Sequence, residues 1–179
     1  MEFSELVNAR RSCRHYTAEP VSGEEIEALL EKANLSASAC NSQPWHFTVL
    51  LSPEKRALGA EAVYVFPPTN AFAREAAALL VLSAEREPEV MPGVKKTLGS
   101  SYFSDIDIGS AAAYFTLAAA DAGLATCIMG VFDEKKLREA AALGADLVPR
   151  LVIALGHAAD GDRPHTKKRK AAAEKTVIL

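Results

Sequence analysis

The chain has 179 residues, of which 49% are hydrophobic and 24% are charged, and its formal net charge at pH 7 is -3. These values are ordinary for a soluble globular protein, and the length suits one domain, residues 1–179, with a core of its own. The small negative charge argues against a general nucleic-acid partner, and no apolar run approaches the roughly 18 residues that a membrane-spanning helix needs.

Two helices are predicted in the first part of the chain. Phe3, Leu6 and Val7 have helical spacing and precede basic residues that suit a helix C-terminus, so a short helix is expected there. Ser22 and Glu25 have the spacing of a capping box, and the apolar residues that follow fall on one stripe. The stretch 22–37 is therefore predicted to contain a second, amphipathic helix.

The middle of the chain predicts two strands around a helix. Residues 45–51 are β-branched and aromatic at their centre, and Ser52-Pro53 is expected to end that strand and start a helix that reaches about residue 62. Thr69 is expected to cap a short helical turn, and 76–84 is a nearly continuous apolar run, typical of a strand buried on both faces. The apolar residues of 85–104 show neither helical nor strand spacing, and we predict a loop or lid there.

The last part of the chain predicts a helix that is apolar on nearly every side. Residues 107–122 are small or apolar almost throughout, so this helix should be enclosed by its own domain or by a second subunit. Strands are predicted at 123–130 and 147–156, with an exposed amphipathic helix at 133–144 between them. The tail, 165–179, is basic and ends in apolar residues that could add a strand or latch elsewhere.

Two basic clusters lie near opposite ends of the chain. Arg10, Arg11 and Arg14 surround Ser12, and guanidinium forks beside a hydroxyl are suited to phosphate oxygens. The second cluster is 167–170. Each cluster alone also fits a solvated surface, and the second resembles a nuclear-localisation or nucleic-acid patch. If the two converged, five or more cations would face one anion of charge about -2, as on a phosphate monoester.

A polar run precedes the only tryptophan. The amides of Asn41 and Gln43 suit the edge of a planar heterocycle, with Pro44 and Trp45 as a rigid apolar wall. The alternative is a helix-to-strand turn whose tryptophan fills the core. Similarly, Gly130 either permits a ligand to approach the backbone closely or simply ends a strand.

Several common sites are not indicated. The chain has no G-x-G-x-x-G after a predicted strand and no Walker motif, which argues against a Rossmann or P-loop nucleotide site. Its four histidines and three cysteines lack metal-ligand spacing, so we predict no metal. The N-terminus has no apolar core followed by a cleavage site, and we expect a cytoplasmic protein with reduced thiols.

Taken in chain order, RRSCRHY, NSQPWHF, DAGLATCIMGVFD, LVIALGH and KKRK resemble the nitroreductase family of FMN-dependent oxidoreductases. The resemblance covers nearly the whole chain, from about residue 9 to the end. It implies an α+β fold in which a mixed, mostly antiparallel sheet is flanked by helices. It also implies a domain-sharing homodimer with two FMN molecules at the subunit interface.

The resemblance assigns the two basic clusters to FMN. Arg10, Ser12 and Arg14 match the family's phosphate and ribityl contacts, and Arg14 also matches a residue that reaches the pyrimidine edge of the flavin. Lys167 and Arg169 resemble the tail pair that closes on the same phosphate. These roles are implied by the resemblance, because the spacing alone leaves the solvated-surface interpretation open.

The resemblance also implies contacts with the flavin ring. Ser38 and Asn41 are similar to the segment that reaches the flavin from the partner subunit, Asn70 to an asparagine that contacts the ring, and Gly130 and Val131 to backbone donors near flavin N5. The predicted FMN-binding residues are Arg10, Arg11, Ser12, Arg14, Ser38, Asn41, Gln43, Asn70, Met129, Gly130, Val131, Lys167 and Arg169.

The function implied by the resemblance is electron transfer from NAD(P)H through flavin N5 to a small acceptor such as a nitroaromatic or a quinone. Because the flavin carries the chemistry, no catalytic acid or base is expected from the protein. A flavin reductase, a dehalogenase or a dehydrogenase of the same fold stays open, as does a flavin-binding module without turnover. Small-molecule substrates and a second copy of the chain are the expected partners, with no nucleic acid and no membrane.

Overall fold

A four-stranded sheet forms the centre of the protein in the computed structural model, which describes residues 1–160, 162 and 167–179. The strand order is β1-β2-β4-β3, and all three pairings are antiparallel. The strands are β1 (Trp45–Leu50), β2 (Ala78–Glu85), β3 (Ala125–Met129) and β4 (Leu147–Gly156). β2 and β4 are therefore central, while β1 and β3 are edge strands.

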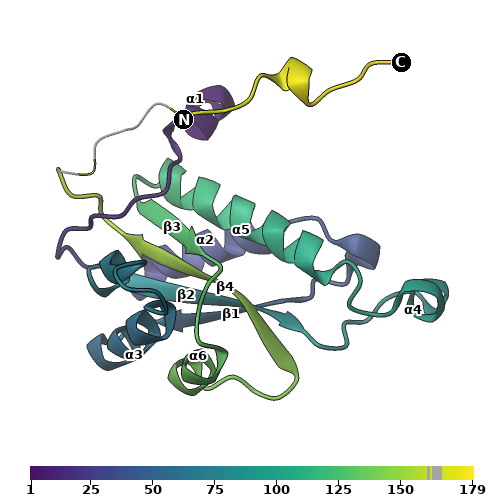
Figure 1. Cartoon of the computed structure of the whole chain (residues 1–179), viewed down its shortest axis with the longest axis horizontal. Helices are drawn as coiled ribbons and strands as arrows, with labels where there is room; N and C mark the ends of the chain where they lie inside the picture. The colour runs from purple at the N-terminus through teal and green to yellow at the C-terminus, as the bar shows by residue number, and fades with distance from the viewer. Residues whose placement is uncertain (161, 163–166) are drawn as a thin grey trace.

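Helices cover both faces of this sheet (Figure 1). α2 (Gly23–Asn34) and α5 (Ser104–Asp121) pack on one face, and α3 (Pro53–Val63) and α6 (Glu134–Ala141) pack on the other. Successive residues of β2 alternate between the two cores: Leu80 and Leu82 join the first, and Leu79 and Val81 join the second. The prediction that this strand is buried on both faces is confirmed.

Three predicted helices begin at capping residues that the sequence indicated or permitted. In α2 the Ser22 hydroxyl accepts a hydrogen bond from the Glu25 N–H at 3.1 Å, and the Glu25 carboxylate accepts one from the Ser22 N–H at 2.8 Å. Ser52 caps α3 and Asp133 caps α6 through a single hydrogen bond each, which the side chain accepts from the backbone N–H three residues later. Such a cap stabilises a helix by about 1 kcal/mol.

Two local predictions are wrong. Residues 85–104 are not loop throughout, because α4 (Pro92–Leu98) forms there with proline in its first turn, a position that proline favours. This helix lies away from the sheet at one end of the molecule (Figure 1) and has no buried residue. Thr69 is not a cap either: Asn70 precedes the short 3-10 turn η2 (Ala71–Arg74), and no side chain caps it.

α5 forms as predicted, three residues earlier than the sequence indicated, but it is not enclosed on every side in this chain. Ile108, Ala111 and Phe115 are buried against the sheet, whereas Ile106 is 66% and Tyr114 46% exposed. The apolar sequence of this helix predicted that it is enclosed on all sides, but its own chain leaves these two side chains exposed. The surplus apolar surface faces outward.

The N-terminal helix and the C-terminal tail lie on the same side of the molecule, away from the sheet (Figure 1). α1 (Phe3–Ala9) has no buried residue and packs on α5. The tail passes α1 and contains a 3-10 turn, η3 (Ala172–Glu174), before it ends in Val177, Ile178 and Leu179, all of them exposed. Within the described chain, this apolar end neither extends the sheet nor packs on the core. None of the described helices is long and apolar enough to cross a membrane.

Candidate functional site

The segment that follows α1 runs along the edge strand β3. Ser12 forms a parallel bridge with Thr126, and the Cys13 N–H donates to the Thr126 carbonyl at 2.9 Å. Cys13 and Tyr16 are buried in the core beneath, so the segment is fixed in place. Burial raises the pKa of the Cys13 thiol to about 11, which keeps it protonated and unreactive at neutral pH.

A pocket of about 630 Å³ opens between α1, α5, β3 and the tail. Three cations from both ends of the chain line this basic pocket: Arg10, Lys167 and Arg169. The sequence left open whether the two basic clusters converge. In the structure these three side chains do.

The opposite wall of the pocket consists of small and apolar groups. Gly109, Ala113, Thr116 and Leu117 form one stripe on α5, and Ile128 of the edge strand completes the wall. A Cβ atom built on Gly109 would meet nothing within 4 Å, so the helix backbone is open to the pocket here. A flat or narrow ligand can approach such a surface closely.

The positive charge in this pocket has no negative counterpart among the described residues that line it, since none of them is acidic. Burial, and then the positive charges of Arg10 and Arg169, lower the pKa of Lys167. The Lys167 ammonium donates to the Val7 carbonyl on α1. Three cations that repel one another in this way are suited to a multiply charged anion.

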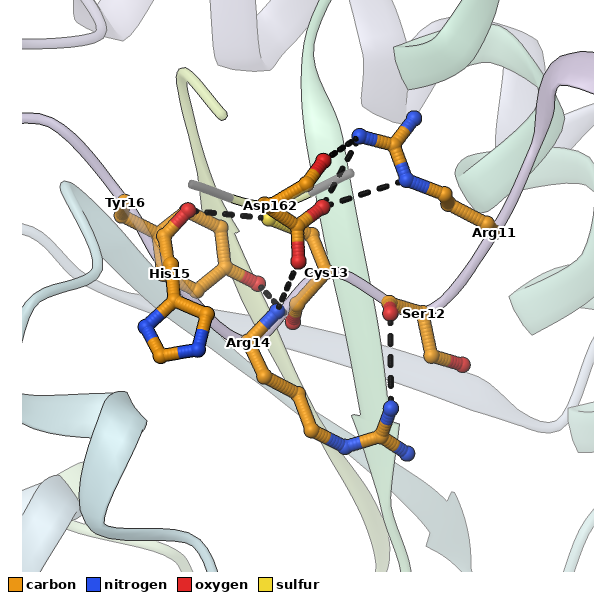
Figure 2. Close-up of polar contacts among 7 residues, drawn as sticks. All are labelled: Arg11, Ser12, Cys13, Arg14, His15, Tyr16 and Asp162. Atoms are coloured by element: carbon orange, nitrogen blue, oxygen red, sulfur yellow. Dashed lines mark hydrogen bonds and ion pairs between the residues drawn. The ribbon is translucent and has the colours of Figure 1, made fainter. Parts of the chain in front are cut away.

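Arg11 does not join the other cations. Its Nε and Nη2 donate to the Asp162 carboxylate at 3.1 and 2.8 Å, and Nη2 also donates to the Asp162 carbonyl at 2.7 Å. The guanidinium of Arg14 points away from Arg11 (Figure 2), and its Nη1 lies 3.5 Å from the Ser12 carbonyl. Arg11 is thus occupied by a carboxylate, whereas Arg14 remains exposed.

The Arg14 side chain and Ser12 lie near Cys127 on β3. Burial raises the pKa of the Cys127 thiol, while the charge of Arg14 and the hydroxyl of Ser12 lower it. Arg14 and Ser12 therefore lie close to β3, but neither lines the basic pocket. Cys127 itself has no role that the sequence indicated.

The loop with Ser38, Asn41 and Gln43 stands apart from this pocket. Cys40, Asn41 and Gln43 have φ angles of 55°, 54° and 45°, a left-handed conformation that costs non-glycine residues about 1–2 kcal/mol each. No hydrogen bond within the described chain reaches the exposed side chain of Asn41, whereas the Gln43 amide donates to the Asn41 carbonyl at 3.1 Å. Strain of this kind often marks functional loops.

Asp107 of α5 anchors the strained loop. Its two carboxylate oxygens lie 3.2 and 3.3 Å from the Ala39 N–H, and the Ser38 hydroxyl accepts from the Gln43 N–H at 3.0 Å. Burial raises the pKa of Asp107, and the hydrogen bond from Ala39 opposes that shift. The loop is therefore held by α5, the same helix that forms the apolar wall of the basic pocket.

Trp45 belongs to the core, as one of the two sequence interpretations proposed. The side chain is 7% exposed, and its indole N–H donates to the Asn34 side-chain oxygen at 2.9 Å. Pro44 is also buried. The interpretation of these two residues as the wall of a ligand site is not supported in this chain.

The remaining predicted residues lie elsewhere. The Asn70 amide donates to the Val63 carbonyl at 3.1 Å, at the end of α3, and the Met129 side chain is buried in the core. Gly130 and Val131 follow β3 directly and are exposed. Sequence reasoning missed Asp162, for which no motif exists, and the stripe of Gly109 and Ala113, whose spacing on one helix face was a usable signal.

The comparison with protein families identifies one family over most of the chain. The model of the nitroreductase family matches residues 7–157. The chain belongs to the nitroreductase family. A protein of Archaeoglobus fulgidus, provisionally named NADH dehydrogenase/NAD(P)H nitroreductase, is 31% identical over 166 residues, which cover 89% of this chain and 87% of that protein.

Two further nitroreductase-family relatives extend the comparison. An oxygen-insensitive NADPH nitroreductase of Helicobacter acinonychis is 33% identical over 93 residues, covering 49% of this chain and 41% of the relative. A provisionally named nitroreductase from Exiguobacterium sibiricum, solved in complex with FMN, superposes with a TM-score of 0.85 at 23% identity, covering 100% of this chain and 98% of the other. The predicted α+β nitroreductase fold is confirmed.

Proposed function

We propose that this chain is an FMN-dependent oxidoreductase that takes electrons from NAD(P)H and passes them to a small acceptor such as a nitroaromatic or a quinone. In this proposal, residues 1–179 act as one FMN-binding domain that works in the cytoplasm. The observation that carries the proposal is the basic pocket, in which Arg10, Lys167 and Arg169 face an open helix backbone. Membership of the nitroreductase family gives the class of chemistry.

The pocket residues fit a flavin monophosphate. A phosphate monoester carries a charge of about -2 at neutral pH and three acceptor oxygens, which matches three cations without an acidic neighbour. The volume of the pocket, about 630 Å³, lies within the range of small-molecule and cofactor sites. Burial, and then the repulsion from Arg10 and Arg169, lower the pKa of Lys167, and a bound phosphate would offset that repulsion.

The protein's part in the reaction is to bind and orient. When bound, FMN supplies the two-electron chemistry, and no side chain is assigned as an acid or a base. Arg10, Lys167 and Arg169 hold the phosphate, and the small residues of α5 shape the space beside it. Arg14, whose exposed guanidinium lies over β3, would face the polar edge of the flavin and favour negative charge there.

We further propose a homodimer in which the loop of one subunit completes the site of the other. The supporting observations are the strained loop with its exposed Asn41, the outward-facing Ile106 and Tyr114 of α5, and the exposed apolar end of the tail. A second copy could cover these apolar surfaces and bring Asn41 to the flavin. The role of Gly130 and Val131 beside the flavin belongs to the same proposal.

The test of this function is spectroscopic. Purified protein is expected to be yellow, to release FMN rather than FAD on denaturation, and to lose its flavin absorbance when NADPH or NADH is added without oxygen. A panel of nitroaromatics, quinones, free flavin and halogenated aromatics then identifies the acceptor class. Protein that gains no flavin absorbance when FMN is added would refute the proposal, and bound FMN that neither nicotinamide bleaches would favour a module without turnover.

A further inference from the structure

Asp162 connects the two chain segments that form the basic pocket. It comes shortly before Lys167 in the tail, and 151 positions separate it from Arg11. Its side chain is only 8% exposed, and one of its oxygens accepts from both Nε and Nη2 of Arg11. The other oxygen accepts from the Arg14 backbone N–H at 3.2 Å (Figure 2).

The Asp162 carboxylate is built to remain charged. Burial alone would raise its pKa, but hydrogen bonds from the Arg14 N–H, the Cys13 thiol and Arg11 outweigh that effect, so the pKa is lowered. A buried carboxylate with donors on both oxygens forms a charge-assisted pair, which is stronger and more directional than an exposed ion pair. Asp162 thus holds the Arg11 side chain and the Arg14 backbone in place.

We propose that Asp162 is a positioning residue for the basic pocket: by clamping Arg11 and the Arg14 backbone, it holds the tail so that Lys167 and Arg169 face Arg10. A chain of n residues spans at most about 3.3–3.6 Å × n, so the few residues after Asp162 keep Lys167 within reach of α1. The clamp also neutralises Arg11, which leaves the anion to Arg10 and the tail pair.

The proposal rests on the proposed function for its ligand, so the experiment has one readout with FMN and one without it. Asp162→Asn is compared with Asp160→Asn, a matched change at an exposed aspartate two positions earlier. Circular dichroism confirms that each variant is folded. With FMN, the dissociation constant of D162N is expected to rise about tenfold, the loss of one charge-assisted contact, while D160N stays within about twofold of wild type.

The decisive comparison repeats D162N in a chain that already carries Lys167→Ala and Arg169→Ala. If Asp162 acts by placing those two cations, its loss should then change FMN affinity by less than about twofold, because residues in one network are not additive. A further drop of about tenfold in that background would overturn the proposal. The charge-exchanged pair Arg11→Asp with Asp162→Arg should recover part of the affinity that either single change loses, and no recovery in a folded protein counts against the clamp.

The readout without FMN is the rate of trypsin cleavage after residues 167–170, followed by mass spectrometry. D162N should be cleaved faster than both wild type and D160N in FMN-free protein, because the tail is released. Equal rates would refute the positioning role whatever the ligand is. Faster cleavage in a protein that binds no FMN would instead support the clamp and reject the proposed cofactor.

Discussion

The basic pocket and the loop at 38–43 differ in one respect: the pocket is formed within a single chain, whereas the loop presents its polar side chain to solvent. The pocket collects cations from both ends of the sequence, because the 10–16 segment lies on β3 and the tail passes α1. The loop lies between α2 and β1, in a strained conformation, and presents Asn41 to solvent. This difference fits the proposed homodimer, in which one subunit binds the phosphate and its partner supplies the loop.

The largest expected effect is at Arg10. Replacing Arg10 with alanine should weaken FMN binding by roughly 2 to 5 kcal/mol, about 30-fold or more, because a charge-assisted contact to phosphate is lost. Arg14→Ala should have an effect of similar direction through the flavin edge. Fluorescence titration of FMN measures both.

The control for these arginines is Lys135→Ala or Lys136→Ala on α6, at exposed positions that do not line the pocket. Either change should leave FMN affinity nearly unaltered. Small and equal losses at all four positions would mean that Arg10 and Arg14 belong to a solvated surface.

The next largest effect is at Gly109, and it separates the ligand site from the fold. Because a Cβ there meets nothing within 4 Å, Gly109→Leu should not destabilise the chain, and better helix propensity should raise its stability by up to about 1 kcal/mol. The same side chain enters the pocket, so FMN binding should fall by about 1–3 kcal/mol, roughly 5- to 150-fold. Thermal unfolding and FMN titration check the two parts.

Gly59 provides the matched control on α3. A Cβ at that position would lie 2.5 Å from Leu50 Cδ1 and 3.0 Å from Leu79 Cδ1, so Gly59→Ala should lower stability by crowding the core. FMN affinity of the folded fraction should not change. If Gly109→Leu behaves like Gly59→Ala, the α5 stripe is a packing surface and not a cofactor wall.

The smallest effects concern the anchor of the loop. Asp107→Ala leaves the Ala39 N–H without its acceptor and should cost about 1–2 kcal/mol of stability, while Asp107→Asn keeps an acceptor oxygen. The raised pKa of Asp107 means that the folded chain takes up its proton before the unfolded chain does. Wild type should therefore gain stability relative to D107N as the pH falls through that raised pKa toward 3.8. Denaturant unfolding at several pH values measures this, and an opposite slope contradicts the assignment.

Local signals predicted the regular elements well. The capping box of Ser22 and Glu25, the Ser52-Pro53 start of α3 and the apolar run of β2 each depend on neighbouring residues alone. α4 escaped prediction because it is short, has no buried residue and therefore carries no apolar period.

The site was predictable only in part, because its contacts are long-range. The composition of the two basic clusters indicated phosphate, but only the fold shows that Arg10 meets Lys167 while Arg11 pairs with Asp162. Similarly, the burial of Trp45 depends on which elements pack over it, so the sequence left two interpretations of equal standing. Pairings between residues far apart in the chain leave no local pattern.

The central proposal is that the loop of one subunit completes the FMN site of the other. It is tested most directly by mixing two defective subunits, Asn41→Ala and Arg10→Ala, and titrating FMN into heterodimers identified by native mass spectrometry. One of the two sites in such a heterodimer combines an intact Arg10 with an intact Asn41 from the partner, and the other combines both defects. We predict one site of wild-type affinity per heterodimer, which neither parent homodimer possesses. Heterodimers without any site of wild-type affinity would show that Asn41 does not complete the partner's basic pocket.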